Sequence, residues 1–193
     1  MAATIDRARV RRLSGIALAM ASGLAIVGSP LYAQGPGRGV TVTIRTVKAL
    51  DKLDINESFV NFKSFHAAMI ADFLGNAIRA EASYKKAYDQ AGSSLRVTQA
   101  YGNFLERTGR GDEAVKIYSA FLEGDSNPLV AEALTNAKAG KKPQPFIATP
   151  GAGAAEAMFS LGTSMTDEQS IDVALLYTQL ALSFNADRPV VLT

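Results

Sequence analysis

The stretch GNAIRAEASY at residues 75–84 is repeated as GRGDEAVKIY at residues 109–118, and this repetition decides the fold. Gly75, Ala80 and Tyr84 each recur 34 residues further along the chain, as Gly109, Ala114 and Tyr118. A constant offset of about 20 to 50 residues is the signature of a repeat architecture. This offset is the length of a helix–turn–helix unit that stacks on copies of itself. We therefore expect a fold that presents surfaces for interaction rather than an active site.

The first 33 residues differ in composition from the rest of the chain. Arg7, Arg9, Arg11 and Arg12 precede an uncharged apolar stretch at residues 13–27, and the small residue Ala33 follows shortly before Gln34. This three-part order predicts a secretory signal peptide at residues 1–33, cleaved after Ala33. The alternative is an uncleaved membrane anchor, but the apolar stretch is shorter than the ~20 residues that a spanning helix needs. The prediction places the protein in the periplasm or outside the cell.

The composition argues against several classes of function. Without residues 1–33, the 20 basic residues fall by 4 to 16 and the 18 acidic residues fall by 1 to 17, so no basic footprint for a nucleic-acid partner remains. The absence of cysteine excludes thiolate metal sites and a cysteine nucleophile. His66 is the only histidine, lies in an apolar run, and is expected to be structural. We expect no enzymatic activity, no catalytic residue, no metal site and no cofactor.

The rest of the chain has the period of helices, with short breaks. A lead-in at residues 34–57 precedes them, and residues 40–58 fit either a strand or a helix. Helical periodicity begins near residue 58 and predicts helix pairs before and after Gly75 and before and after Gly109. A further helix is expected at residues 129–139, a proline-rich loop at residues 141–153, and renewed helical periodicity from residue 154. A capping box at residues 166–169 predicts the start of the last helix.

The repeated residues resemble those of the tetratricopeptide repeat (TPR) family. Small residues recur at two positions of each unit, where they let the two helices approach closely; they are Ala68, Gly102 and Gly162, and Ala80, Ala114 and Ala174. The aromatic Tyr84 and Tyr118 are replaced by Thr178 in the third unit. The resemblance implies an all-α, right-handed solenoid of antiparallel helix pairs at residues 58–193. Its units would be residues 61–94, 95–128 and 155–188, with an insertion at 129–154 and a further repeat starting at 189.

In this family the first helices of the units line a concave groove that holds a peptide or a helix of a partner. The resemblance assigns to that groove Arg96, Gln99, Asn103 and Glu106 from the second unit, Phe62, Phe65 and Met69 from the first, and Phe159 from the third. For Phe62, Phe65 and Met69 the alternative is burial in the core, because apolar stripes on helices usually face inward. For the polar set the alternative is solvated surface. The lysine and asparagine pattern of the subgroup that clamps a C-terminal carboxylate is missing.

These features predict a non-enzymatic protein–protein interaction scaffold of the bacterial cell envelope, whose partner is a protein or a peptide. Two alternatives remain open from the sequence. The chain is the N-terminal part of a larger repeat protein whose activity lies further downstream, or it is an assembly factor tethered to the membrane by residues 13–28. Signal cleavage separates the last alternative from the first prediction. A longer reading frame separates the fragment from the complete scaffold.

Overall fold

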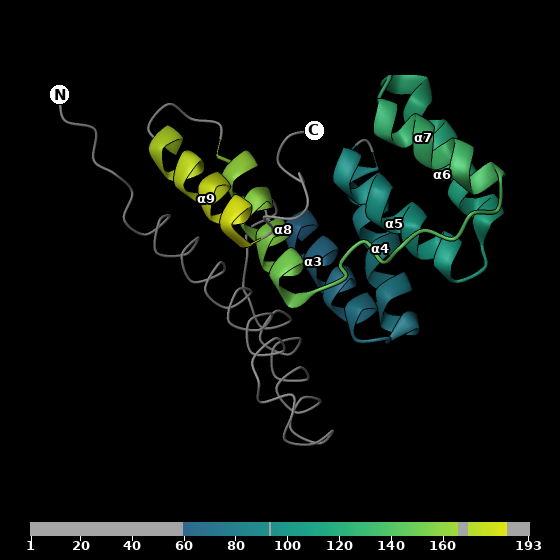
Figure 1. Ribbon diagram of the computed structural model, residues 1–193, viewed down its shortest axis with the longest axis horizontal. Coiled ribbons are helices and arrows are strands. Elements are labelled where there is room, and N and C mark those ends of the chain that lie inside the picture. The colour runs from purple at the N-terminus through teal and green to yellow at the C-terminus, as the bar shows by residue number, and fades with distance from the viewer. Residues whose placement is uncertain (1–59, 93, 166–169, 185–193) are drawn as a thin grey trace, which may run out of the picture. The chain divides into compact units, whose positions relative to one another are not determined.

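The computed structural model describes residues 60–92, 94–165 and 170–184, and these residues form helices joined by turns and loops, with no strand among them (Figure 1). This confirms the all-α prediction for that part of the chain. The predicted signal peptide, the lead-in and the capping box at residues 166–169 lie outside it. The contacts divide the chain into two compact units, and one of them, Ile55–Ala148, contains five helices. They are α3 (Val60–Phe73), α4 (Ala77–Ala91), α5 (Leu95–Arg107), α6 (Gly111–Gly124) and α7 (Pro128–Lys138).

The offset of the sequence repeat is reproduced in the turns that end α3 and α5. Gly75 and Gly109 both have left-handed backbone, with φ of 73° and 84°, which a residue with a side chain adopts only at a cost. After α3 the N–H of Asn76 donates to the carbonyl of Ala71 at 2.9 Å; after α5 the N–H of Arg110 donates to the carbonyl of Leu105 at 2.8 Å. Both turns are Schellman motifs that satisfy the last carbonyls of a helix. The two glycines therefore mark structurally equivalent turns.

Small and aromatic residues alternate in the core between these helices. Ala80 and Ala114 are fully buried, as are the two repeated tyrosines, Tyr84 and Tyr118. Helix α3 packs on α4, α5 on α6, and α4 on α5, so that each pair also contacts the next. The ring of Tyr84 on α4 lies 5.8 Å from that of Tyr101 on α5, centroid to centroid, which joins the two pairs through an aromatic contact.

Helix α7 follows the second pair and packs on α6. It begins at Pro128, which takes the first helical position, and the Asn127 side chain caps it by accepting a hydrogen bond from the N–H of Leu129 at 3.0 Å. Gly140, with a φ of 66°, ends it. The chain then runs without regular structure, and residues 141–148, which we call the return segment, come back to α5 (Figure 1).

The second compact unit contains α8 (Pro150–Thr163) and α9 (Ile171–Phe184), which pack on each other. The predicted loop to residue 153 is too long, because α8 already begins at Pro150. The Thr149 hydroxyl caps it by accepting from the N–H of Ala152 at 3.1 Å, and proline favours the first helical position.

A Cβ on Gly162 would lie 3.0 Å from the Thr178 hydroxyl oxygen. Gly102 faces Tyr118 in the corresponding way, 60 residues earlier.

A candidate binding face on helix α5

Three of the predicted groove residues share one face of α5. Arg96, Gln99 and Asn103 are spaced by three and four positions, which places them one above the other along a helix. All three side chains are half-buried. Arg96 donates from its Nη1 to Oε1 of Gln99 at 3.0 Å. We call these three residues the α5 face.

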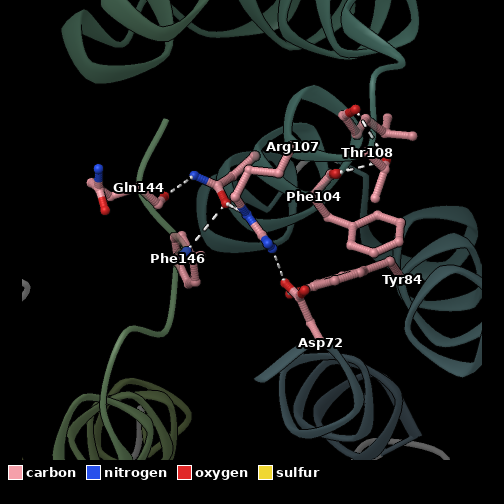
Figure 2. Close-up of polar contacts among 9 residues, drawn as sticks. Asp72, Tyr84, Phe104, Arg107, Thr108, Gln144 and Phe146 are labelled. Carbon is pink, nitrogen blue, oxygen red and sulfur yellow. Dashed lines mark hydrogen bonds and ion pairs between the residues drawn. The ribbon is translucent and has the colours of Figure 1, made fainter. Parts of the chain in front are cut away.

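The return segment lies across the α5 face and is held there by its backbone. Nδ2 of Asn103 donates to the carbonyl oxygen of Gln144 at 2.8 Å, and the N–H of Phe146 donates to Oδ1 of the same asparagine at 3.1 Å. Figure 2 shows Gln144 and Phe146 on this segment, each at the end of a dashed line that marks one of these two hydrogen bonds. One amide side chain therefore satisfies a donor and an acceptor of an irregular backbone, which would otherwise depend on water.

Two side chains of the return segment add apolar contacts. The guanidinium carbon of Arg96 lies 4.7 Å from the centre of the Phe146 ring, within the range of a cation–π contact. Phe146 is half-buried and packs on the core of the unit, while Ile147 is 6% exposed and belongs to that core. The segment is thus held by an aromatic and an aliphatic side chain in addition to the two hydrogen bonds of its backbone.

Arg107 fixes the orientation of the Asn103 amide. Its Nε donates to Oδ1 of Asn103 at 3.0 Å, so the oxygen faces the arginine and the amide nitrogen is left to donate to Gln144. The same guanidinium forms an ion pair with Asp72 of α3, which also accepts a hydrogen bond from the Tyr84 hydroxyl at 3.4 Å (Figure 2). A chain of polar contacts therefore leads from α3 through α5 to the return segment. Arg107 is a positioning residue for the site.

Glu106 is not part of the surface of α5. Its side chain is 8% exposed and its Oε1 accepts a hydrogen bond from the hydroxyl of the buried Tyr118 at 2.8 Å. Burial raises the pKa of Glu106 above its ordinary value, and the hydrogen bond from Tyr118 lowers it by less. The equivalent pair one repeat earlier is Asp72 and Tyr84, at the same separation of 12 residues. Glu106 therefore belongs to the core contacts between α5 and α6.

The stability of the protein is expected to fall between acidic and neutral pH because of Glu106. Its folded-state pKa lies above the ordinary value of 4.5, so in the window between the two the folded chain holds a proton that the unfolded chain has released. Stability then decreases as the pH rises through that window. Glu106→Gln retains an acceptor for Tyr118 and removes the titration, so this decrease should disappear. Urea unfolding followed by circular dichroism, from about pH 3 to about pH 7, measures it and also covers the range below the ordinary carboxyl pKa.

Glu113→Gln is the matched control for this pH dependence. Hydrogen bonds from Arg110 lower the pKa of Glu113, so its contribution is present above the ordinary pKa and is lost as the pH falls. The two variants should change the pH profile in opposite directions. A Glu106→Gln profile that coincides with that of the unchanged protein would contradict the assignment.

The apolar residues predicted for the groove lie elsewhere. Phe65 and Met69 are 5% and 4% exposed and belong to the core of residues 55–148, as the alternative of burial predicts. Phe62 is half-buried and its ring stacks on that of His66, 4.0 Å between centres. Phe159 is half-buried on α8, in the other compact unit. Among the predicted groove residues of the unit Ile55–Ala148, Arg96, Gln99 and Asn103 are brought together with a common occupant.

Sequence reasoning missed the residues that occupy the α5 face and the arginine that orients Asn103. The sequence predicts only a loop at Gln144, Phe146 and Ile147, because the prolines around them interrupt helical periodicity. A signal was present in the run PQPFI, where an aromatic and a β-branched residue stand in an otherwise polar loop. Burial of an aromatic or aliphatic side chain of this size stabilises a fold by roughly 1.5–3 kcal/mol, which favours a packed position for both.

In the described residues, His, Asp and Glu side chains form no group of three or more that would suit a metal ion. No helix of that part of the chain is long and apolar enough to cross a membrane. Comparison of the chain with protein-family models, with curated proteins and with solved structures finds no match.

Proposed function

We propose that this chain is a non-enzymatic protein–protein interaction scaffold and that its α5 face binds an extended peptide. The observation that carries the proposal is the pair of hydrogen bonds in which the Asn103 side chain donates to the carbonyl oxygen of Gln144 and accepts from the N–H of Phe146. A side-chain amide that hydrogen-bonds to one N–H and one carbonyl oxygen of an extended backbone can bind peptides of varied sequence, because these groups belong to the backbone. The neighbouring Arg96 and the apolar core beside it supply selectivity for an aromatic and an aliphatic side chain.

The proposal extends to the architecture and the location of the protein. Equivalent turns at Gly75 and Gly109, and the equivalent tyrosine–carboxylate pairs that go with them, support a TPR-like solenoid of helix pairs. Repeat proteins of this kind use the exposed faces of successive helices to bind partners. The basic and apolar start of the sequence supports export to the periplasm or beyond. A protein exposed there would meet extended segments of other envelope proteins.

The proposal is tested by selecting peptides that bind the full chain from a displayed random library, and by measuring their affinity for Asn103→Ala. We expect the selected peptides to lose at least about tenfold in affinity, because two backbone hydrogen bonds disappear. Asn61→Ala on α3 is the matched control, since it removes a half-buried asparagine outside the α5 face and should leave the affinity unchanged. Selected peptides that bind Asn103→Ala and the unchanged protein equally would contradict the proposal.

A further inference from the structure

The return segment has the properties of a peptide ligand that is already in place. Pro143 and Pro145 fix their own φ, and each disfavours helical backbone in the residue before it. Gln144, which precedes Pro145, offers its carbonyl oxygen to Asn103. The segment therefore loses little conformational freedom when it lies on α5. Nothing in these contacts requires that the segment belong to the same chain.

Each feature of the return segment meets a different group on the helices. The backbone at Gln144 and Phe146 is recognised by Asn103, and the Phe146 ring by the guanidinium of Arg96. Ile147 enters the core. Along the segment, the helices thus contact first a backbone restricted by proline, then an aromatic side chain, and then an aliphatic side chain. A ligand of the α5 face is therefore expected to present these three features in the same order.

The segment is held at both ends of its course. It leaves α7 at Gly140, where Lys141 donates from its Nζ to Oδ1 of Asn136 at 3.1 Å, and it ends before the cap of α8 at Thr149. A short tether gives such a segment an effective concentration on the order of millimolar at its own site. A free peptide that makes the same contacts must compete with it. The affinity measured for that peptide is reduced in proportion to the fraction of molecules whose α5 face is open.

We infer that the return segment is an internal occupant of the α5 face, and that the partner it excludes carries an extended segment of the same pattern: proline, any residue, proline, aromatic, aliphatic. This inference rests on the proposed function and adds to it the sequence class of the partner peptide and the element that controls access. Binding of a partner requires that residues 143–147 leave α5. The anchors of the internal copy are uneven, because Gln144 is exposed and Phe146 half-buried, whereas Ile147 is buried in the core and has to leave it.

The test uses a fluorescein-labelled synthetic peptide of the sequence KKPQPFIATP, residues 141–150, and the full chain. Phe146→Ala removes the aromatic contact of the internal copy and leaves Arg96 and Asn103 unchanged. We expect this variant to bind the peptide at least about tenfold more tightly than the unchanged protein, as measured by fluorescence anisotropy. The double variant Asn103→Ala, Phe146→Ala should lose this increase in affinity for the peptide. A peptide with alanine in place of its phenylalanine should bind the opened variant at least about tenfold more weakly.

Equal affinity of the unchanged protein and of Phe146→Ala for the peptide, with matching circular dichroism spectra, would overturn the inference. Hydrogen exchange of the unchanged protein with excess peptide gives an independent reading. The amide of Phe146 in the chain should lose protection as the peptide displaces it, and retained protection in the peptide-bound protein would contradict displacement. A dimer in which two copies exchange their return segments would also contradict an internal occupant.

The outcome distinguishes this inference from the proposed function. If peptides selected from the random library depend on Asn103 but their affinity is unchanged by Phe146→Ala, the scaffold function stands and the internal occupant is refuted. If neither the selected peptides nor the KKPQPFIATP peptide depends on Asn103, the α5 face is not a peptide site and both proposals fail.

Discussion

Gly102→Ala is expected to destabilise the protein by about 2–3 kcal/mol. Alanine is the best helix former, so this change inside an open helix would add about 1 kcal/mol of stability. At Gly102, however, a Cβ atom would lie within 3.0 Å of the ring of Tyr118, a distance that real Cβ atoms essentially never show. The ring is 1% exposed and its hydroxyl is hydrogen-bonded to Glu106, so it has no room to retreat. The midpoint of urea unfolding, followed by circular dichroism, measures the loss.

Gly111→Ala provides the matched control on the neighbouring helix. Gly111 is the first residue of α6, it lacks a positive φ, and a Cβ atom there would meet nothing within 4 Å. This variant should be neutral or more stable by about 0.5–1 kcal/mol, because alanine restricts the unfolded chain. The two glycine substitutions are thus expected to have opposite signs. A stabilising Gly102→Ala would show that α5 and α6 are not in close contact at this point.

Arg107→Leu is expected to cost about 2–4 kcal/mol, because it leaves the carboxylate of Asp72 without its cation. The Asp72 side chain is 11% exposed and that of Arg107 21%, so solvent replaces only part of the lost interaction. The remaining partner of Asp72 is the hydroxyl of Tyr84, at 3.4 Å. The substitution also removes the donor that orients the Asn103 amide. Unfolding by urea and hydrogen exchange at the amide of Phe146 should therefore both change.

Arg107→Lys separates the two roles of the arginine. Its single ammonium group keeps a positive charge beside Asp72 but has no Nε to donate to Asn103 at the same time. We expect a smaller loss of stability than in Arg107→Leu, together with reduced protection of the Phe146 amide. If protection at Phe146 were the same in Arg107→Lys as in the unchanged protein, Arg107 would have no positioning role at the α5 face.

The helices and their turns were predictable because the information about them is local or periodic. Gly75 and Gly109 stand where helices end, and the tyrosines at the same offset identify the buried face of α4 and α6. The predicted start of α8 is wrong, because Pro150 followed by a glycine is also typical of a loop. The cap supplied by Thr149 together with proline at the first helical position is equally local, and it defines the observed start.

The candidate site was predictable only in part, because its second half comes from far along the chain. Periodicity placed Arg96, Gln99 and Asn103 on one face of α5, but no local pattern indicates that Phe146, 43 residues from Asn103, returns to it. The burial of Glu106 could not be predicted from the sequence either. A carboxylate in a helix is expected in solvent, and its burial here depends on the hydroxyl of Tyr118. Contacts of these kinds become visible only when the helices are packed.

The wide separation between Asn103 and the return segment has a consequence for the order of folding. Most contacts within α3–α6 join neighbouring helices and close early, whereas a contact between residues 43 positions apart has to wait for a larger loop to close. During synthesis, α5 is complete well before Phe146 leaves the ribosome. We therefore expect folding to pass through an interval in which α3–α6 are packed and Asn103 is still uncovered. A partner present at that moment meets no competitor.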